Sequence, residues 1–330
     1  MPISDTWDEY DTLLYNEWLG VNLKATRVAD DKKRRDLGIH DDVRRFLARA
    51  RLGNIAIRQH KLLPDLVKQF FASVRVYYED GVETAQTGVL TFMAKGVRYR
   101  VSFLELCQIY GFQLHRTATS LPTTFPDMRT FWNLFAHGHY DTSGTLHTDI
   151  KHPAVYYLAC LLANTILYKN EPGKMRIDEL VLMFSCLRED ILFPTSTPHL
   201  DVDANLGAVF AHQLMSVKYT PFTVASSKPF QAGSLLTPIF EFCRIDTSNL
   251  TVRGTGQHMV IWPIPELLTI RYGALALAFQ VDPALLRQVA RRSTSRRKAS
   301  APAGASTRVN ASRSAGEPQP EPLRFIDIPQ

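Results

Sequence analysis

The sequence feature that most constrains the fold is a change of hydrophobic period within residues 87–112, TGVLTFMAKGVRYRVSFLELCQIYGF. Residues 97–101 alternate between apolar and polar side chains, as a half-buried strand does. Residues 87–93 have the composition of a partner strand, and the short connection between the two ends on Gly96, which can adopt a positive φ. The sequence therefore predicts a β-hairpin at this point.

A helix is predicted directly after the hairpin. Ser102 precedes Glu105 by three residues, which is the spacing of a capping box that satisfies the free amides of a new helix. Apolar residues then recur at i, i+3, i+4 and i+7 and give the helix one apolar face: Phe103, Leu106, Cys107 and Tyr110. Gly111 is a natural left-handed stop. A hairpin leading into a capped helix is thus predicted, and this stretch contains no evident chemistry.

Most of the remaining apolar residues also recur at helical spacing. The strongest helix is predicted over residues 154–168, which are apolar nearly all round, and residues 75–78 read as a third strand beside the hairpin. Further helices are predicted after Asp41 or Asp42, from Pro64, over residues 128–136 and 178–191, after Asp203 or Asn205, and over residues 265–279 and 283–290. The predicted fold class is mainly α with a small antiparallel β-hairpin or sheet (α+β) and a disordered basic C-terminal tail.

Composition divides the chain into three predicted regions. Residues 1–35 form an acidic and aromatic N-terminal arm followed by a basic linker, in which residues 1–20 are either a helix docked by its aromatic side chains or a loosely held arm. Residues 36–290 form a mainly helical globular region. Residues 291–330 are Ser, Ala, Pro, Gly and Arg with almost no large apolar side chain, so they cannot bury enough surface to offset chain entropy and are predicted to be disordered.

The net charge of +6 lies almost entirely in the tail, where eight Lys or Arg residues face three acidic ones. Basic side chains in a mobile segment can neutralise phosphates without reading sequence, and the same residues could serve as a nuclear import signal. The candidate nucleic-acid-binding or nuclear-import residues are Arg291, Arg292, Arg296, Arg297 and Lys298. A merely solubilising tail is the third interpretation. In the hairpin, Arg98 and Arg100 are expected to point outward and to be solvated.

The histidine-rich stretch near residue 140 invites an enzymatic interpretation and also has a simpler one. Residues 141–144, Asp-Thr-Ser-Gly, resemble the catalytic turn of an aspartic protease with one residue inserted before the glycine, and a surface turn capped by Asp141 is favoured. His137 and His139 could ligate a metal together with Asp141, but no spaced Cys or His partner completes the site. The prediction is a polar loop without a metal.

Other catalytic motifs are incomplete. Gly173 and Lys174 are followed by Met175, where a phosphate-binding loop has Ser or Thr. Acidic pairs such as Asp178 and Glu179 read as helix caps and solvated faces rather than as buried acid–base pairs. The sequence therefore predicts no catalytic residue, no cofactor and no small-molecule substrate.

Cysteine use and hydropathy indicate an intracellular protein. The four cysteines are widely spaced and read as reduced, mostly buried thiols: Cys107, Cys160, Cys186 and Cys243. The N-terminal sequence MPISDTWDEYDTLLY is acidic and lacks the pattern of a signal peptide. Residues 154–168 are interrupted by Asn164 and Thr165 and fall short of the about 20 apolar residues that a membrane span needs. The expected location is the nucleus or the cytoplasm, without a membrane partner.

Three stretches together resemble the first-open-reading-frame proteins of Athila-type plant LTR retrotransposons. They are residues 74–112, Phe131–Trp132 and residues 149–184, and they carry a "Thr-Gly-Val…Phe…Gly-x-x-Tyr" strand pair, a "Leu-x-Glu-Leu…Gly-Phe" helix and a "His-Pro…Tyr-Leu…Leu-Ala-Asn-Thr" helix. The resemblance covers about residues 46–219. It implies a Gag-like protein that associates with itself and packages element RNA. The chain has no zinc knuckle, which places the expected RNA contact on the basic tail.

Three functions are compatible with these observations. The favoured one is a non-enzymatic Gag-like structural protein of a plant retrotransposon, or a remnant of one, that self-associates and contacts RNA or DNA non-specifically through its tail. The alternative is a host nuclear adaptor or chromatin-associated protein derived from a transposon. The third is a metal-dependent hydrolase centred on His137, His139 and Asp141.

Overall fold

In the computed structural model, the described residues are 5–124, 128–169, 173–190, 202–223, 229–231, 233–254 and 257–258. Their helices are α1 (Glu9–Leu19), α2 (Asp31–Asp36), α3 (His40–Arg49), α4 (Gly53–Ile57), α5 (Pro64–Ser73), α6 (Phe103–Tyr110), α7 (Met128–Asn133), α8 (Pro153–Asn164), α9 (Ile177–Leu187), α10 (Leu206–Ser216), α11 (Thr220–Thr223) and α12 (Thr237–Phe242). Short 3-10 turns are η1 (Glu79–Gly81), η2 (His147–Asp149), η3 (Val217–Tyr219) and η4 (Gly233–Leu236). The strands are β1 (Arg27–Val28), β2 (Arg75–Tyr78), β3 (Gly88–Ala94), β4 (Val97–Ser102) and β5 (Gln257–His258).

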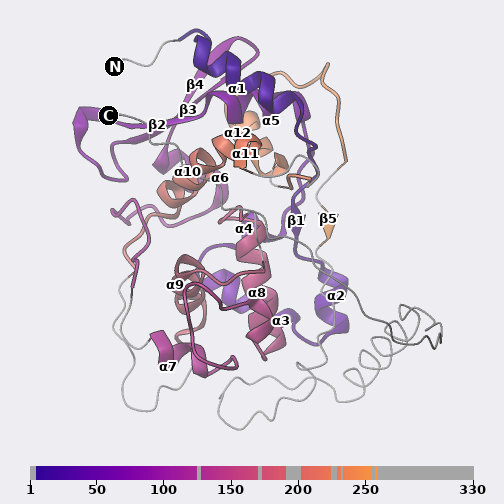
Figure 1. Ribbon diagram of the computed structural model, residues 1–330, viewed down its shortest axis with the longest axis vertical. Coiled ribbons are helices and arrows are strands. Elements are labelled where there is room, and N and C mark those ends of the chain that lie inside the picture. Colours follow the sequence, from indigo (N-terminus) through magenta and orange to yellow (C-terminus); the bar gives the residue numbers. More distant parts are fainter. Residues whose placement is uncertain are drawn as a thin grey trace, which may run out of the picture.

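This element content confirms the predicted fold class, a mainly α protein with a small antiparallel sheet. Figure 1 shows the sheet with α1 and α5 in the upper part of the molecule and α3, α8 and α9 in the lower part. One continuous hydrophobic core runs through both. The predicted helices over residues 265–279 and 283–290 and the predicted disorder of the tail lie outside the described residues, and the domain boundaries at 35 and 290 stay predictions.

The central sheet is the hairpin that the period change predicts, together with the predicted third strand. Its order is β2-β3-β4, and both pairings are antiparallel. Lys95 and Gly96 connect β3 to β4 with φ values of 50° and 79°. Two consecutive positive φ values give the turn whose twist matches that of the flanking strands, so these residues set the register in which Phe92 lies opposite Tyr99.

The capped helix after the hairpin also forms as predicted. The Ser102 hydroxyl accepts from the backbone N–H of Glu105, whose carboxylate accepts in turn from the backbone N–H of Ser102. Gly111 ends α6 in the left-handed conformation with φ 75°. A Cβ placed on Gly207 of α10 would lie 2.4 Å from the carbonyl oxygen of Phe103, so this glycine allows α10 to pack closely on α6.

The aromatic N-terminal segment is a docked helix, the first of its two predicted alternatives. Asp8 caps α1 by accepting from the backbone N–H of Asp11 at 2.7 Å. The buried Trp18 stacks on Phe71 of α5 with 4.9 Å between ring centroids. Its indole N–H donates to the backbone oxygen of Lys218 at 3.1 Å. The helix is therefore fixed to both α5 and η3.

Several helix ends differ from the prediction for local reasons. The N-cap position of α3 is Ile39, so Asp41 and Asp42 lie in the first turn and neither is the cap. Asn205 rather than Asp203 caps α10 by accepting from the N–H of Ala208. Helix α8 ends at Asn164, four residues before the predicted end, because Thr165 has φ −114° and ψ −92°. Among the described residues, no helix is long and apolar enough to cross a membrane.

One expected solvent exposure is corrected by the structure. Arg98 was expected to point outward with Arg100, but its side chain is fully buried and pairs with Asp11 of α1. Arg100 is exposed and pairs with Asp5, as an outward residue can. The physical reason is that α1 brings a carboxylate to the sheet, which gives the Arg98 guanidinium a partner away from water. The alternation in β4 could not reveal this partner.

Candidate functional site

The predicted nucleic-acid or import residues lie outside the described residues. They are Arg291, Arg292, Arg296, Arg297 and Lys298. Their role stays a prediction, and the sites that follow are built from the described part of the chain.

The histidine-rich stretch is a surface turn. His137, His139 and Asp141 are all exposed. Asp141 accepts from the backbone N–H of Ser143 at 3.1 Å and from its hydroxyl at 2.7 Å, and these bonds lower the pKa of the carboxyl. Across the described residues, no group of three or more His, Cys, Asp and Glu side chains could hold a metal ion. The described geometry is that of the capped turn that the sequence favours.

A row of three functional groups lies between η2, α8 and α9. The Nε2 atom of His147 donates to Oε1 of Glu179 at 2.8 Å, and Cys160 Sγ lies 3.8 Å from His147 Nδ1. The Glu179 side chain is fully buried, which corrects its interpretation as a solvated residue. Thiol enzymes use the same order of groups, in which a cysteine nucleophile lies beside a histidine base that a third group orients. His147 is 13 residues from Cys160 and 32 residues from Glu179 in the sequence, so no short motif indicates this row of groups.

The electrostatics of this row are those of a structural contact. Burial is the main cause that raises the pKa of the Cys160 thiol to about 12, whereas reactive cysteines have a lowered thiol pKa. Glu179 also pairs with Lys169 and accepts from the backbone N–H of Arg176 at 2.9 Å. One carboxylate therefore joins η2, the chain after α8 and the start of α9.

A second buried carboxylate organises the other end of the molecule. Asp11 accepts from Arg98 at 3.0 Å and from Arg75 at 2.8 Å, and Lys218 Nζ lies 3.6 Å from it. These partners come from β4, β2 and η3. Desolvation lowers the pKa of Lys218 to about 8, although the charge of Asp11 acts in the opposite direction. The cluster holds α1 against the sheet by charge as well as by packing.

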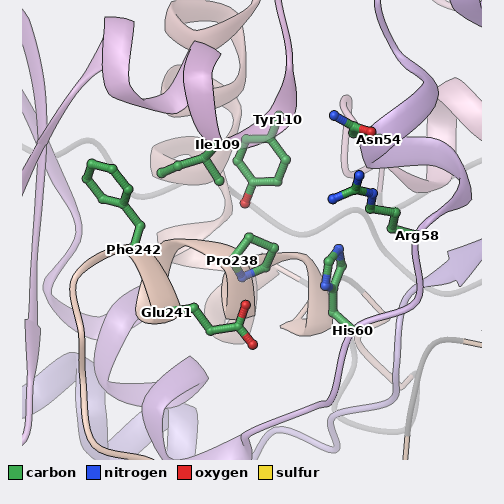
Figure 2. Close-up of a pocket in the computed structure, with 8 residues that line it drawn as sticks. All are labelled: Asn54, Arg58, His60, Ile109, Tyr110, Pro238, Glu241 and Phe242. Carbon is green, nitrogen blue, oxygen red and sulfur yellow. The ribbon is translucent and has the colours of Figure 1, made fainter.

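A pocket of about 260 Å³ opens between α4, α6 and α12. It is lined by Asn54, Arg58, His60, Ile109, Tyr110, Pro238, Glu241 and Phe242. Figure 2 shows Asn54, Arg58 and His60 along one side and Ile109 and Phe242 on the other, with Pro238 between them. Ligand sites for drug-sized molecules have about 300–1,000 Å³, so this pocket has room only for a small group.

The pocket is lined by polar and apolar side chains without a hydroxyl, thiol or amine nucleophile apart from the Tyr110 phenol. Burial, with a contribution from the charge of Arg58, lowers the pKa of His60, so His60 is neutral at pH 7. The Tyr110 hydroxyl is committed to the backbone oxygen of Leu235 at 2.5 Å, and burial raises its pKa. The lining residues include no serine, threonine, cysteine or lysine that could act as a nucleophile.

Comparison with known proteins gives one family. A family model described as the ATHILA ORF-1 family matches residues 6–260, which is more than three quarters of the chain. The match contains every described element from α1 to β5. Comparisons with curated proteins and with solved structures gave no match.

Proposed function

Since the chain belongs to the ATHILA ORF-1 family, a family of retrotransposon proteins, we propose that it is a non-enzymatic, Gag-like structural protein of a plant element or its remnant. In this proposal it associates with itself and binds RNA or DNA, in the cytoplasm or nucleus, through its basic tail. The family match over residues 6–260 is the observation that carries the proposal.

The chemistry of the described residues is in keeping with a structural role. The two buried carboxylates, Glu179 and Asp11, each bind groups from several elements and thereby hold the fold together. The aligned Cys160 keeps its proton at neutral pH because burial raises its pKa. Nothing in this arrangement requires a substrate.

Nucleic-acid binding is assigned to the five basic residues within 291–298 because their charge is concentrated in a segment of small and polar residues. Contacts between such side chains and phosphates release counterions, so the affinity falls steeply with salt and depends little on sequence. For single strands the logarithm of affinity falls with a slope of about −0.7 per neutralised phosphate, so five contacts contribute up to about −3.5.

The test is single-stranded RNA binding by the full chain across a salt series. Replacing Arg291, Arg292, Arg296, Arg297 and Lys298 with Gln should weaken binding and flatten the salt slope. A matched control replaces Lys32, Lys33 and Arg35, the exposed basic residues of α2, and should bind as the wild type does. Unchanged binding by the tail variant, or equally tight low-salt binding by a chain truncated before Arg291, would show that the tail is not the binding site.

Self-association is tested separately, by sedimentation of the purified full chain with and without RNA. Large oligomers or particles support the Gag-like function. A chain that stays monomeric at high concentration and accumulates in nuclei contradicts it and favours the nuclear adaptor, for which the two basic groups around residues 293–295 would act as the import signal.

A further inference from the structure

One wall of the pocket between α4, α6 and α12 is apolar and partly open to solvent. Phe242 of α12 is 44% exposed, and its ring contacts no other aromatic ring among the described residues. Ile109 of α6 and Pro238 of α12 are half-buried and continue this wall. Figure 2 shows Phe242 and Ile109 across the pocket from Arg58. An exposed aromatic ring in a pocket wall is a surface on which a flat ligand ring can stack.

The pocket also contains polar side chains that have no partner within the described residues. The Arg58 guanidinium is exposed and takes part in no ion pair there. In the same part of the chain, the side chains of Asn54 and Glu241 take part in no hydrogen bond. Figure 2 shows Arg58 beside Asn54, and Glu241 below Pro238. A ligand that fills the pocket has to pair with these groups, because polar groups that lose water without gaining a partner cost free energy.

These groups together define the chemistry of the ligand. It needs a flat apolar face for Phe242, a negative charge for Arg58, and an edge with a donor for Glu241 and a donor or acceptor for Asn54. An apolar side chain of a protein partner would leave Asn54 and Glu241 unpaired, and an acidic side chain would bring no donor to Glu241. A nucleotide supplies all three features, since every base has a flat face and a hydrogen-bonding edge close to a phosphate. A single base is also a group small enough for about 260 Å³.

Two further cations lie on segments that adjoin the pocket. Lys61 follows Arg58 by three residues, and its backbone oxygen accepts from the Thr237 hydroxyl at the start of α12 at 2.6 Å. The backbone N–H of Arg253 donates to the oxygen of Leu62 at 2.9 Å, so this segment lies beside the first. Both basic side chains are exposed and take part in no ion pair of the described residues. Cations next to a base-binding pocket can pair with the phosphates of neighbouring nucleotides.

We propose that this pocket binds one nucleotide of a single-stranded nucleic acid. The base lies on Phe242, and its edge bonds to Asn54 and Glu241. Its phosphate pairs with Arg58, and the two cations on the adjoining segments bind the phosphates of the neighbouring nucleotides. A single strand fits because its bases can turn outward, whereas the bases of a duplex are paired and stacked. The site belongs to the described part of the chain and does not rest on the proposed function of the basic tail.

Binding of a short fluorescent single-stranded RNA at low salt tests the stacking contact. The parent protein is the full chain with the five basic tail residues replaced by Gln, so that binding by the tail does not hide that by the pocket. Phe242→Ala should weaken binding at least about fivefold, because it removes the surface on which the base stacks. The matched control is Phe222→Ala, an aromatic residue of α11 that is 53% exposed, and it should bind as the parent does. Equal affinities of the two variants would overturn the proposal.

The salt dependence of the same binding tests the phosphate contact. In the same parent, Arg58→Gln should weaken binding and reduce the slope of log affinity against log salt by about 0.7, the contribution of one phosphate of a single strand. The matched control is Arg188→Gln, an exposed arginine directly after α9 that takes part in no ion pair of the described residues. It should leave the slope unchanged. A slope that Arg58→Gln does not alter would overturn the phosphate contact.

Two further measurements identify the ligand and its position. Adenosine monophosphate should displace the RNA only at concentrations far above the Kd of the RNA, because it lacks the neighbouring phosphates. Equally tight binding of the free nucleotide would overturn a strand as the ligand. Ultraviolet light joins a base to a side chain that it touches, and we expect the cross-linked peptide to contain Phe242.

Cross-links only to other peptides, or no RNA binding by the parent at low salt, would overturn the pocket as a binding site. The proposed function of the tail would survive either result, because it is measured on the wild-type chain. If the wild type lost no affinity when its tail residues were replaced, the tail function would fail and the pocket would not.

Discussion

Arg98 of β4 and Asp11 of α1 form an ion pair at 3.0 Å with both side chains fully buried. The pair joins an N-terminal helix to the central sheet, and Arg75 and Lys218 contact the same carboxylate. Attraction between buried charges offsets their desolvation only when the geometry is good and all partners are present. The position of α1 against the sheet therefore depends on Asp11.

The first prediction concerns the loss of this carboxylate. Asp11→Ala should lower the free energy of unfolding by about 3–5 kcal/mol, because it leaves the buried Arg98 without its partner. Urea unfolding followed by tryptophan fluorescence measures the change, since Trp18 lies on the same helix. The control is Asp5→Ala, which removes the exposed partner of Arg100 and should cost no more than about 1 kcal/mol. Equal losses in the two variants would contradict a central role for the buried pair.

Lys218 should make the stability rise in mildly alkaline solution. Its pKa is lowered to about 8 in the folded protein, while an unfolded lysine titrates near about 10.4. Between these values the unfolded state binds more protons, so the free energy of unfolding contributed by this group increases with pH.

The test compares the free energies of unfolding of the wild type and Lys218→Met from pH 7 to pH 9.5. Because both proteins contain the same ionising thiols, the difference between them isolates the contribution of Lys218. The difference should grow in favour of the wild type above pH 8, at up to about 1.4 kcal/mol per pH unit. The control is Lys33→Gln, on the exposed side of α2, whose free energy of unfolding should change with pH as that of the wild type does. Parallel curves for Lys218→Met as well would refute the lowered pKa.

His152 should make the protein sensitive to acid. Burial lowers its pKa to about 3, whereas the unfolded residue takes up a proton near about 6.5. Stability from this group is present above pH 6.5 and is lost as the pH falls toward 3. His152 caps α8 through its Nδ1 atom, and Asn can supply an equivalent acceptor.

Unfolding free energies at pH 7 and pH 5 test this. The free energy of unfolding of the wild type should fall by about 2 kcal/mol more than that of His152→Asn over this interval. The reason is that the His152 contribution changes by about 1.4 kcal/mol per pH unit below pH 6.5. The exposed His137→Asn should lose as much as the wild type. If His152→Asn were as acid-sensitive as the wild type, the neutral buried imidazole would not be the cause.

Local signals in the sequence predicted the elements well. The Ser102–Glu105 box and the Lys95–Gly96 turn each act within a few residues, so the residues themselves contain the information. Pro64 begins α5 for the same reason, because its ring fixes the first helical φ. The matched family spans these elements, in agreement with the resemblance read from their order.

Contacts between distant segments could not be predicted in this way. Arg98 and Asp11 are 87 residues apart, so the strand alternation alone could not show that α1 covers the Arg98 side chain. Glu179 caps the start of α9, as the sequence predicts, by accepting from the backbone N–H of Arg176. Its second partner, His147, lies 32 residues away and could not be predicted locally. The pocket takes its walls from α4, α6 and α12, and no single stretch of sequence contains more than one wall.

The last prediction concerns the close contact of α10 with α6 at Gly207. A Cβ at this position would lie 2.4 Å from the carbonyl oxygen of Phe103 and 2.8 Å from Cys107 Sγ, and the first of these is backbone that cannot rotate away. Gly207→Ala should therefore destabilise the protein by about 1–3 kcal/mol, even though alanine is the better helix former by up to about 1 kcal/mol. Gly53→Ala in α4, where a Cβ meets nothing within 4 Å, is the matched control and should leave the urea midpoint unchanged or slightly higher. If Gly207→Ala left the stability unchanged, α10 could shift away from α6 at little cost, and the glycine would not be what brings the two helices together.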